Sequence, residues 1–514
     1  MDFKTTTETI PAAEDIFSGI QEQTIELDYI LPDYYPDIFR LVHCEAVPVI
    51  TGYSLVGDKL SYELRCDIRI LYCSENGSLL QSVEQHQTFT RTADIGKICE
   101  SPEIKLIPKS DHINFRAVNK RRLDMRGAVS IKISVSGENF QEVISDACGM
   151  NIQLKKTPVQ FASKKLSAEK IVSISDNIEL SPAQPDAAGI VNVRCKALEC
   201  EKKMVSGKLL VKGDISVNLL YSCEIGGECA VEPLSFTLPY SQIVDIDFLD
   251  ENFICKVTPE VISCEVTPSA DNCRNIACEA EIRLVCGAVK TSSVMLVTDA
   301  FSTIYPCEVT FSDISAEQIP VISSENFTHT AMLADGDNVP MNIYSMWCTP
   351  KNINTHISDD RKSLVISGML TFSMAAKDNS GAIIMPERDD AFEENIPLSE
   401  DVENPPANIQ ISVKEVSFNI DSNGTLTAKA ELSAEITMTD CENIHVVSDI
   451  TINDTERKKR DGDYAVKLYF GTENEKIWDI AKRCSTSVNA IMEENALTDD
   501  KLKNGTMLLI PIVT

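Results

Sequence analysis

A segment of strictly alternating apolar residues occurs twice in this chain, 149 residues apart and without a gap. Alternation with a period of two is typical of a β-strand that buries one face and exposes the other. The positions in the two copies are Leu60, Tyr62, Leu64, Cys66, Ile68, Ile70 and Tyr72, and then Leu209, Val211, Gly213, Ile215, Val217, Leu219 and Tyr221. Leu71 also recurs, as Leu220. We therefore expect repeated β-rich units.

A third copy lies at residues 364–376, where the offset is 155 and Ala376 replaces the tyrosine. Each copy is followed by a second alternating segment, at residues 123–135, 276–284 and 426–438. Turn-rich segments such as SENGS, EIGGE and DSNGT separate the strands. The pattern predicts a mainly β protein with three tandem antiparallel β-sandwich-like domains. A repeat of about 150 residues is too long for a solenoid unit, so we expect independent domains in series.

The pattern also predicts where these domains begin and end. We expect an N-terminal arm at residues 1–22 and three repeats at 23–160, 161–300 and 301–445. Residues 446–463 include DTERKKRDGD, which predicts a charged linker. Residues 464–514 differ in kind, because strand, helix, helix and strand patterns follow one another as a small βααβ domain. Ile477, Ile480 and Ala481 form one buried helix face, and Ser487 is a good N-cap for the second helix.

Charge and cysteine content exclude several classes of function. The net charge of −31 repels nucleic-acid phosphates and anionic lipid head groups, so we expect no binding to nucleic acids or membrane surfaces. No segment approaches the ~18 unbroken apolar residues of a membrane span, so we expect no membrane insertion. The first residues, MDFKTTTETIPAAEDIF, lack the basic start and apolar core of a signal peptide, which favours a cytosolic protein with reduced thiols among its 18 cysteines. A zinc site is disfavoured because the cysteine spacings, such as that of Cys195 and Cys200, are wider than C-x2-C.

No pattern in the sequence assembles an active site. The six histidines are scattered, and the chain contains no HExxH, GxSxG or Walker A motif and no GxGxxG preceding a helix. Acidic pairs such as Asp389 and Asp390 lie in a charged segment that is more simply a solvated face. Trp347 is more simply core or inter-domain packing than a ligand platform. We therefore predict neither an enzyme nor a cofactor.

The C-terminal unit resembles a LysM domain over its whole length, from VKLYF to LLIPI. The segments IWDIAKR, LTDDKL and NGTMLLIP, with Asn495 ending the second helix, occur in the order and spacing of that family. Near the N-terminus, LPDYYPDI and the strand that ends in LYC resemble the SPOCS domain of endospore-forming bacteria. Tandem SPOCS repeats followed by one LysM are similar to the SipL-like family of spore coat morphogenetic proteins of clostridia.

This resemblance implies a function without catalysis. Members of the family are mother-cell proteins that bind SpoIVA, the coat-basement ATPase, and so keep the coat attached to the forespore surface. The LysM domain is the expected docking element for this SpoIVA-type ATPase and other coat proteins. The localisation implied is the mother-cell cytoplasm, the forespore surface and the spore coat.

The alternative is that the LysM domain binds peptidoglycan and anchors the protein to cortex or cell wall. LysM domains typically bind N-acetylglucosamine polymers in a shallow groove beside a Gly-Asp-Thr loop. In this chain Asn474, Glu475 and Lys476 occupy the three positions before Ile477, so the glycine that lets a sugar approach the backbone is absent. This difference favours a protein partner, and glycan binding remains the alternative hypothesis.

Six residues of the LysM domain are candidates for partner binding. Trp478 is one of only two tryptophans and could be an interface hot spot, although packing of the helix against the sheet explains it equally well. Val466 could line the same surface. The remaining candidates are Lys467 in the first strand, Asn474 and Glu475 in the first loop, and Leu497 at the start of the LTDDKL connector.

Overall fold

The computed structural model describes residues 3–74, 80–98, 102–226, 228–269, 271–317, 321–397, 408–438, 441–459 and 465–511. Antiparallel strands dominate the fold, and the two α-helices of these residues lie near the C-terminus. In the described part of the chain, no helix is long and apolar enough to span a membrane. The predicted fold class, tandem β-sandwich-like domains followed by a βααβ domain, is confirmed.

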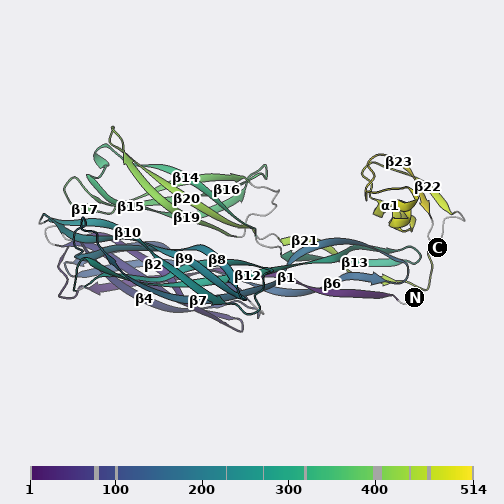
Figure 1. The fold of residues 1–514 in the computed structure, drawn as a ribbon, viewed down its shortest axis with the longest axis horizontal. Helices are drawn as coiled ribbons and strands as arrows, with labels where there is room; N and C mark the ends of the chain where they lie inside the picture. Colours follow the sequence, from purple (N-terminus) through teal and green to yellow (C-terminus); the bar gives the residue numbers. More distant parts are fainter. Residues whose placement is uncertain are drawn as a thin grey trace.

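Three units of the same design follow one another along the chain (Figure 1). The first contains β1 (Lys4–Ile30), β2 (Ile38–Val56), β3 (Lys59–Ser74), β4 (Leu80–Asp94), β5 (Glu103–Asn119) and β6 (Arg122–Cys148). The second contains β7 (Ile152–Glu179), β8 (Gly189–Val205), β9 (Lys208–Ile225), β10 (Glu228–Asp245), β11 (Phe253–Pro268) and β12 (Asn275–Ser302). The third contains β13 (Cys307–Glu317), β14 (Val321–Asp335), the 3₁₀-helix η1 (Gly336–Asn338), β15 (Asn342–Ile357), β16 (Ser363–Lys377), β17 (Ile383–Ile384), β18 (Glu387–Pro397), β19 (Asn408–Ile420), β20 (Thr425–Met438) and β21 (Cys441–Ile452).

Each unit is a sandwich of two antiparallel sheets with corresponding strand orders. In the first unit these are β2-β3-β4 and β1-β6-β5, and in the second β8-β9-β10 and β7-β12-β11. The alternating segments of the sequence are the central strands β3, β9 and β16, whose apolar faces lie in three separate hydrophobic clusters. Tyr72 and Tyr221 occupy equivalent places, since their hydroxyls donate to the carbonyl oxygens of Pro36 and Pro185 at 3.0 and 3.3 Å.

An arginine clamp repeats in the same two units. Arg121 donates to the carbonyl oxygens of Leu31 and Pro32 and pairs with the Asp37 carboxylate at 2.7 Å. In the second unit, Arg274 donates to the carbonyl oxygens of Leu180 and Ser181 and pairs with the Asp186 carboxylate. Each guanidinium satisfies loop carbonyls that no strand pairs, which fixes the proline-containing loop before the next strand.

The first and last strands of each unit, in chain order, extend beyond the sandwiches and build a narrow stalk (Figure 1). Its apolar interior is shared by six strands from the three units and contains Ile10, Val143, Val159, Phe161, Val294, Leu296, Ile314, Ile444 and Val446. A contact of β1 with β13, at Ala12 and Ala316, joins the first and third units in one five-stranded sheet. The three units therefore share a core, and the expectation of independent domains in series was wrong.

A second shared core lies where the three sandwiches meet. Leu71, Leu220 and Ala375 occupy the same position of the three central strands, and all three are buried together. They point away from the interior of their own sandwich, because they belong to the alternate face of each strand. Trp347 packs beside them and lies over the Arg194 guanidinium at 4.2 Å, which confirms its interpretation as inter-domain packing.

The observed elements run across several of the predicted boundaries. The predicted arm, residues 1–22, lies largely in β1, and the boundaries at 160/161 and 300/301 fall within β7 and β12. Strand β21 continues to Ile452, inside the segment predicted as a linker. Strands β1, β7 and β12 are long because one end of each lies in the stalk and the other end in a sandwich. Alternation alone does not show that a single strand passes through both structures.

The cysteines differ in one respect from the expectation. Cys195 of β8 and Cys264 of β11 form a disulfide between the two sheets of the second sandwich, whereas the sequence favoured reduced thiols throughout. Cys44, Cys278 and Cys286 are among the cysteines that the structure describes as free thiols. The bonded residues are 69 positions apart, and only the packing of the edge strands β8 and β11 brings them together.

Candidate functional site

The C-terminal unit is a two-stranded sheet covered on one face by two helices. It contains β22 (Val466–Gly471), α1 (Ile477–Cys484), α2 (Val488–Glu494) and β23 (Thr506–Pro511). The Ser487 hydroxyl accepts a hydrogen bond from the Ala490 amide at 3.1 Å, so the predicted N-cap of α2 is confirmed. Ile477, Ile480 and Ala481 are fully buried, as their spacing predicts. The inner face of the sheet adds Leu508 and Ile510 to the same cluster.

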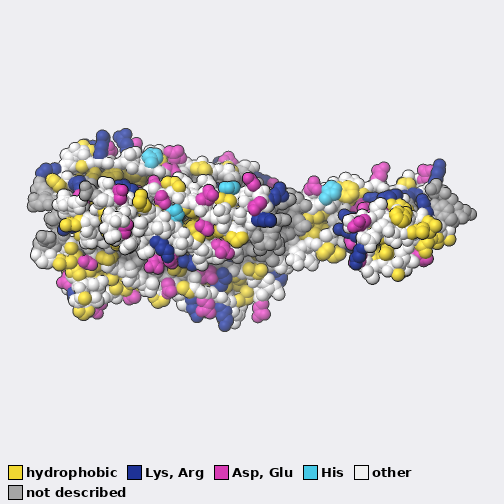
Figure 2. Space-filling model, turned by 90° about the horizontal axis from the view of Figure 1, so that it is seen from above, with side chains coloured by type: hydrophobic (Ala, Val, Ile, Leu, Met, Phe, Trp, Pro, Cys, Tyr) yellow, Lys and Arg dark blue, Asp and Glu magenta, His cyan; other side chains and the backbone are white. Residues whose placement is uncertain are grey.

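The outer face of this sheet is apolar and uncovered. Leu468 pairs with Leu509 and Phe470 with Met507 across the two strands, while Val466 lies at the end of the same face. The exposed fractions are 42% for Val466, 64% for Leu468, 70% for Phe470, 63% for Met507 and 38% for Leu509. Figure 2 shows hydrophobic and basic side chains close together on this unit, at one end of the molecule. A contiguous exposed patch of this kind is typical of a protein interaction surface.

Residues of β12 attach the unit to the tip of the stalk. The Phe301 side chain is 3% exposed and belongs to the hydrophobic cluster of the C-terminal unit. Its ring meets the Trp478 ring edge to face, with the centroids 5.0 Å apart. The segment after β21 is held at the same place, because Lys458 donates to the carbonyl oxygen of Ser302 at 2.7 Å.

Asp299 completes this attachment. Its carboxylate accepts the indole N–H of Trp478 at 2.7 Å and pairs with Lys482 Nζ at 2.7 and 2.9 Å. The side chain of Asp299 is 18% exposed, so these charge-assisted hydrogen bonds are partly shielded from solvent. Such bonds are stronger there than at a fully exposed surface. Trp478 therefore lies half-buried against the stalk, whereas Val466 lies on the outer sheet face.

The loop between β22 and α1 is fixed by Glu475. Its carboxylate accepts hydrogen bonds from the Tyr469 hydroxyl at 2.7 Å and the Thr472 amide at 3.0 Å, and it pairs with Arg483 at 3.1 Å. The hydroxyl bond from Tyr469, with help from the Thr472 amide and Arg483, lowers the pKa of Glu475. Asn474 has a φ of +64°, in the left-handed region that favours glycine, and its amide donates to the Leu502 carbonyl at 2.8 Å. Both residues shape the loop.

The two remaining candidates lie in different environments. Lys467 is exposed on β22, one position after Val466. Leu497 packs against the hydrophobic cluster of the unit and follows Ala496, whose φ is +49°. The end of α2 is tied to β23 by Asn495, whose side-chain amide exchanges hydrogen bonds of 2.7 Å with both backbone groups of Leu509.

A cleft of about 530 Å³ lies between the C-terminal unit and strand β7 of the stalk. One wall is the start of α1 with Lys476 and Trp478, together with Lys501 from the loop before β23. The opposite wall is the segment of β7 that contains Lys155 and Lys156. The cleft thus combines an aromatic ring with several ammonium groups, and it exists because the unit is docked on the stalk.

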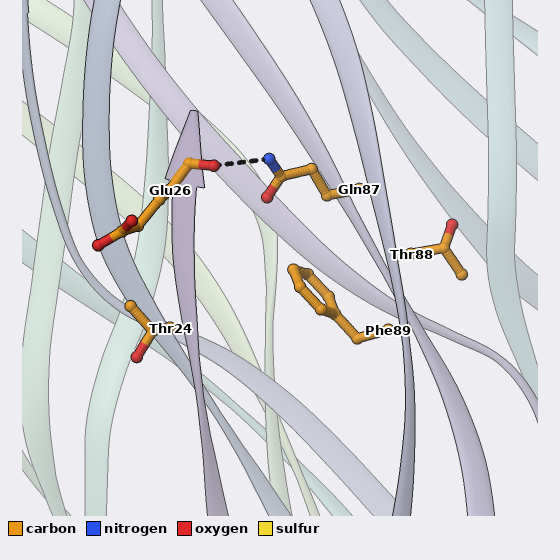
Figure 3. Close-up of a pocket in the computed structure, with 5 residues that line it drawn as sticks. All are labelled: Thr24, Glu26, Gln87, Thr88 and Phe89. Atoms are coloured by element: carbon orange, nitrogen blue, oxygen red, sulfur yellow. Dashed lines mark hydrogen bonds between the residues drawn. The ribbon is translucent and has the colours of Figure 1, made fainter. Parts of the chain in front are cut away.

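The described residues give no support for a catalytic or metal site. They contain no group of three or more His, Cys, Asp or Glu side chains that could hold a metal ion. A shallow hollow of about 630 Å³ on the first sandwich is lined by Thr24, Glu26, Gln87, Thr88 and Phe89 (Figure 3). The Gln87 amide donates to the Glu26 carbonyl at 2.8 Å, and the lining offers a single carboxylate without a basic or nucleophilic partner.

Several residues of this region were missed from the sequence. Leu468, Phe470, Met507 and Leu509 were not singled out, although TMLLI has apolar residues on both strand faces, a pattern that indicates a second apolar surface on this sheet. Asp299 and Phe301 carry no local signal, because they lie 179 and 177 residues from Trp478 and reach it only through the fold.

The fold and the site define a chain of β-sandwich domains that carries a small βααβ binding module. Residues 186–269, which contain β8 to β11, match the SPOCS domain of SipL, and residues 472–511 match the LysM domain. A SPOCS domain followed by a C-terminal LysM domain is an arrangement similar to that of SipL-like proteins, and the two matches suggest a sporulation protein related to the coat, with a domain of the peptidoglycan-binding type. Both matched families are non-catalytic. No curated protein and no solved structure matches the chain.

Proposed function

We propose that this protein is a non-enzymatic scaffold of spore coat assembly, whose LysM domain binds a SpoIVA-type coat-basement ATPase and so tethers the coat to the forespore. It acts in the mother-cell cytoplasm, at the forespore surface. The observation that carries the proposal is the uncovered apolar face of the LysM sheet, with Leu468 and Phe470 at its centre. Such a face favours binding to a folded protein, because the surface of a folded partner can bury all of these side chains at once.

The six candidate residues take different parts in this proposal. Val466 belongs to the outer sheet face, and Lys467 lies beside it as a charged rim. Asn474, Glu475 and Leu497 keep the loops in shape for the partner. Trp478 holds the domain on the stalk through Asp299 and exposes part of its ring to the cleft.

The second candidate function is peptidoglycan binding, which the LysM match favours. Two observations weigh against it. The Asn474 side chain occupies the loop position where a glycine would let a sugar approach the backbone, and β7 lies across the cleft beside that loop. Basic side chains also line this cleft, whereas a neutral glycan is recognised mainly by hydroxyl contacts and stacking.

A binding assay with the full chain tests the proposal. Phe470→Glu places a charge on the outer face, and we expect it to weaken capture of the purified ATPase by about tenfold or more. Phe140→Glu is the matched control, because Phe140 is 56% exposed on the stalk strand β6, and it should bind like the wild type. Equal capture of both variants would contradict the proposal. Sedimentation with insoluble peptidoglycan, unaffected by Phe470→Glu, would instead support the second candidate.

A further inference from the structure

The cleft between the LysM domain and β7 has a charge opposite to that of the chain as a whole. Lys155, Lys156, Lys476 and Lys501 line it together with one carboxylate, that of Asp500. Four ammonium groups against one carboxylate leave an excess of three positive charges in the lining, or two when the Asp146 partner of Lys156 is counted, in a chain whose net charge is −31. A local reversal of this size, inside a concavity, concentrates anionic ligands near it.

The packing of the stalk leaves three of these four ammonium groups available for a ligand. Lys156 pairs with Asp146 at 2.8 Å. Lys155 lies opposite Asp299 in the register of β7 and β12, but the Asp299 oxygens are already bonded to Trp478 and Lys482. Within the described ranges, no ion pair joins Lys155, Lys476 or Lys501 to a carboxylate.

The two lysines of the LysM wall are held side by side. Lys476 and Lys501 form an isolated antiparallel bridge, and the Ile477 amide donates to the Asp500 carbonyl at 2.8 Å. Two neighbouring ammonium groups repel each other, and a bound anion relieves this repulsion. The backbone contacts therefore fix the two positions from which these lysines line the cleft, where both charges favour a bound anion.

The size and lining of the cleft indicate the kind of anion. A cleft of about 530 Å³ has room for a ligand much larger than one phosphate ion. The indole of Trp478 and the side chain of Leu154 add apolar surface between the lysines. A ligand that fits both features has carboxylates on either side of an apolar side chain, as a short acidic peptide segment does.

We propose that this cleft binds an acidic peptide segment of a protein partner, which is held between Lys155 and Lys156 of the stalk and Lys476 and Lys501 of the LysM domain. The inference rests on the proposed function in taking a protein as the ligand of the domain. It concerns a different surface, since the outer sheet face is apolar and lies on the other side of the sheet from the helices.

Two synthetic peptides test the cleft on the full chain. Acetyl-Glu-Glu-Phe-Glu-Glu-amide supplies the expected chemistry, and acetyl-Gln-Gln-Phe-Gln-Gln-amide is its uncharged match. By calorimetry we expect the acidic peptide to bind with a Kd of about 0.1–1 mM and the uncharged one at least tenfold more weakly. In a Trp347→Phe background, Trp478 is the single tryptophan, and its fluorescence should change on binding.

Variants assign the binding to the two walls. Lys155→Gln and Lys501→Gln should each weaken the acidic peptide by about three- to fivefold, as expected for loss of one partly exposed ion pair. Lys503→Gln is the matched control, because Lys503 pairs with Asp499 in the same loop and does not line the cleft, and it should bind normally. Asp299→Ala should also weaken binding, because it loosens the attachment that brings the two walls together.

Other outcomes would overturn the inference. These are equal affinity for the two peptides, binding that is the same in Lys155→Gln and the wild type, and tighter binding of a chitin hexamer or of inorganic phosphate at the same lysines. The proposed function is tested separately, since the Phe470→Glu assay reports on the outer face. Normal capture of the ATPase without peptide binding would reject only the proposed peptide site in the cleft.

Discussion

The indole nitrogen of Trp478 donates a 2.7 Å hydrogen bond to the carboxylate of Asp299, a residue 179 positions earlier in the chain. This bond joins the LysM domain to the stalk strand β12, beside the buried ring of Phe301. It also explains why the sequence supported a packing role and an interface role of Trp478 equally. The residue packs against another part of the same chain and still lines an accessible cleft.

Asp299→Ala should loosen the attachment of the LysM domain. The carboxylate accepts from both Trp478 and Lys482, so its loss should cost about 2 kcal/mol of docking free energy. Amide hydrogen exchange should rise in α1 and in β12 near Phe301, and the segment after β21 should be cut faster by protease. Asp313→Ala, which removes an exposed partner of His445 on β13, is the control and should leave both measurements unchanged. Unchanged exchange in Asp299→Ala would show that Phe301 alone holds the domain.

Trp478→Ala removes the ring that holds the LysM domain on the stalk, and it should weaken binding of the proposed ATPase partner by about 2 kcal/mol, roughly thirtyfold in affinity. Trp478→Phe should weaken it less, because a smaller ring still meets Phe301 at the stalk. Circular dichroism must accompany the binding measurement, since truncating a packed tryptophan can cost 3–5 kcal/mol of stability. A folded Trp478→Ala variant with wild-type affinity would remove Trp478 from the partner-binding set.

Glu475 should make the LysM domain acid-sensitive. Its pKa is lowered from 4.5 in the folded state by the Tyr469 hydroxyl, the Thr472 amide and Arg483. A depressed folded-state pKa contributes stability above the unfolded-state value, and this contribution is lost as pH falls through the folded-state pKa. The thermal unfolding midpoint of the LysM domain, measured by Trp478 fluorescence in the Trp347→Phe background, should therefore decrease below about pH 4.5. Glu475→Gln should unfold at a lower temperature at pH 7 and lose part of this pH dependence, while Glu473→Gln, at an exposed neighbour, should not. An identical pH profile in Glu475→Gln would contradict this account.

The disulfide between Cys195 and Cys264 should stabilise the second sandwich. It connects residues 69 positions apart, and a bridge of that span typically contributes about 2–4 kcal/mol. Peptide mapping without reductant should recover the linked pair. Cys195→Ser and Cys264→Ser should each lower the unfolding midpoint, whereas Cys200→Ser, at an exposed free thiol on the same strand as Cys195, should have little effect. Recovery of both cysteines as free thiols in protein protected from reductant would reject the bridge.

The sequence by itself determined the strands, their repetition and the C-terminal unit. Alternation fixes which side chains share a face, so the gap-free offset placed Tyr72 and Tyr221 at equivalent positions, where the structure finds them. Helical spacing and the cap at Ser487 were equally local, and both were correct. Strand faces and helix caps depend on residues a few positions apart, and the repeat appears when two segments of the sequence are compared directly.

Only the tertiary structure decided what covers each face. Leu71 and Leu220 recur in the sequence, but their burial with Ala375 depends on three sandwiches meeting at one place. In the same way, Asp299 and Phe301 became part of the LysM attachment because the stalk brings β12 to α1. A period of two indicates that a strand has two faces. It does not indicate which distant segment of the chain packs against each face. The shared cores, the docked domain and the lysine cleft therefore arise from long-range packing, which no local pattern records.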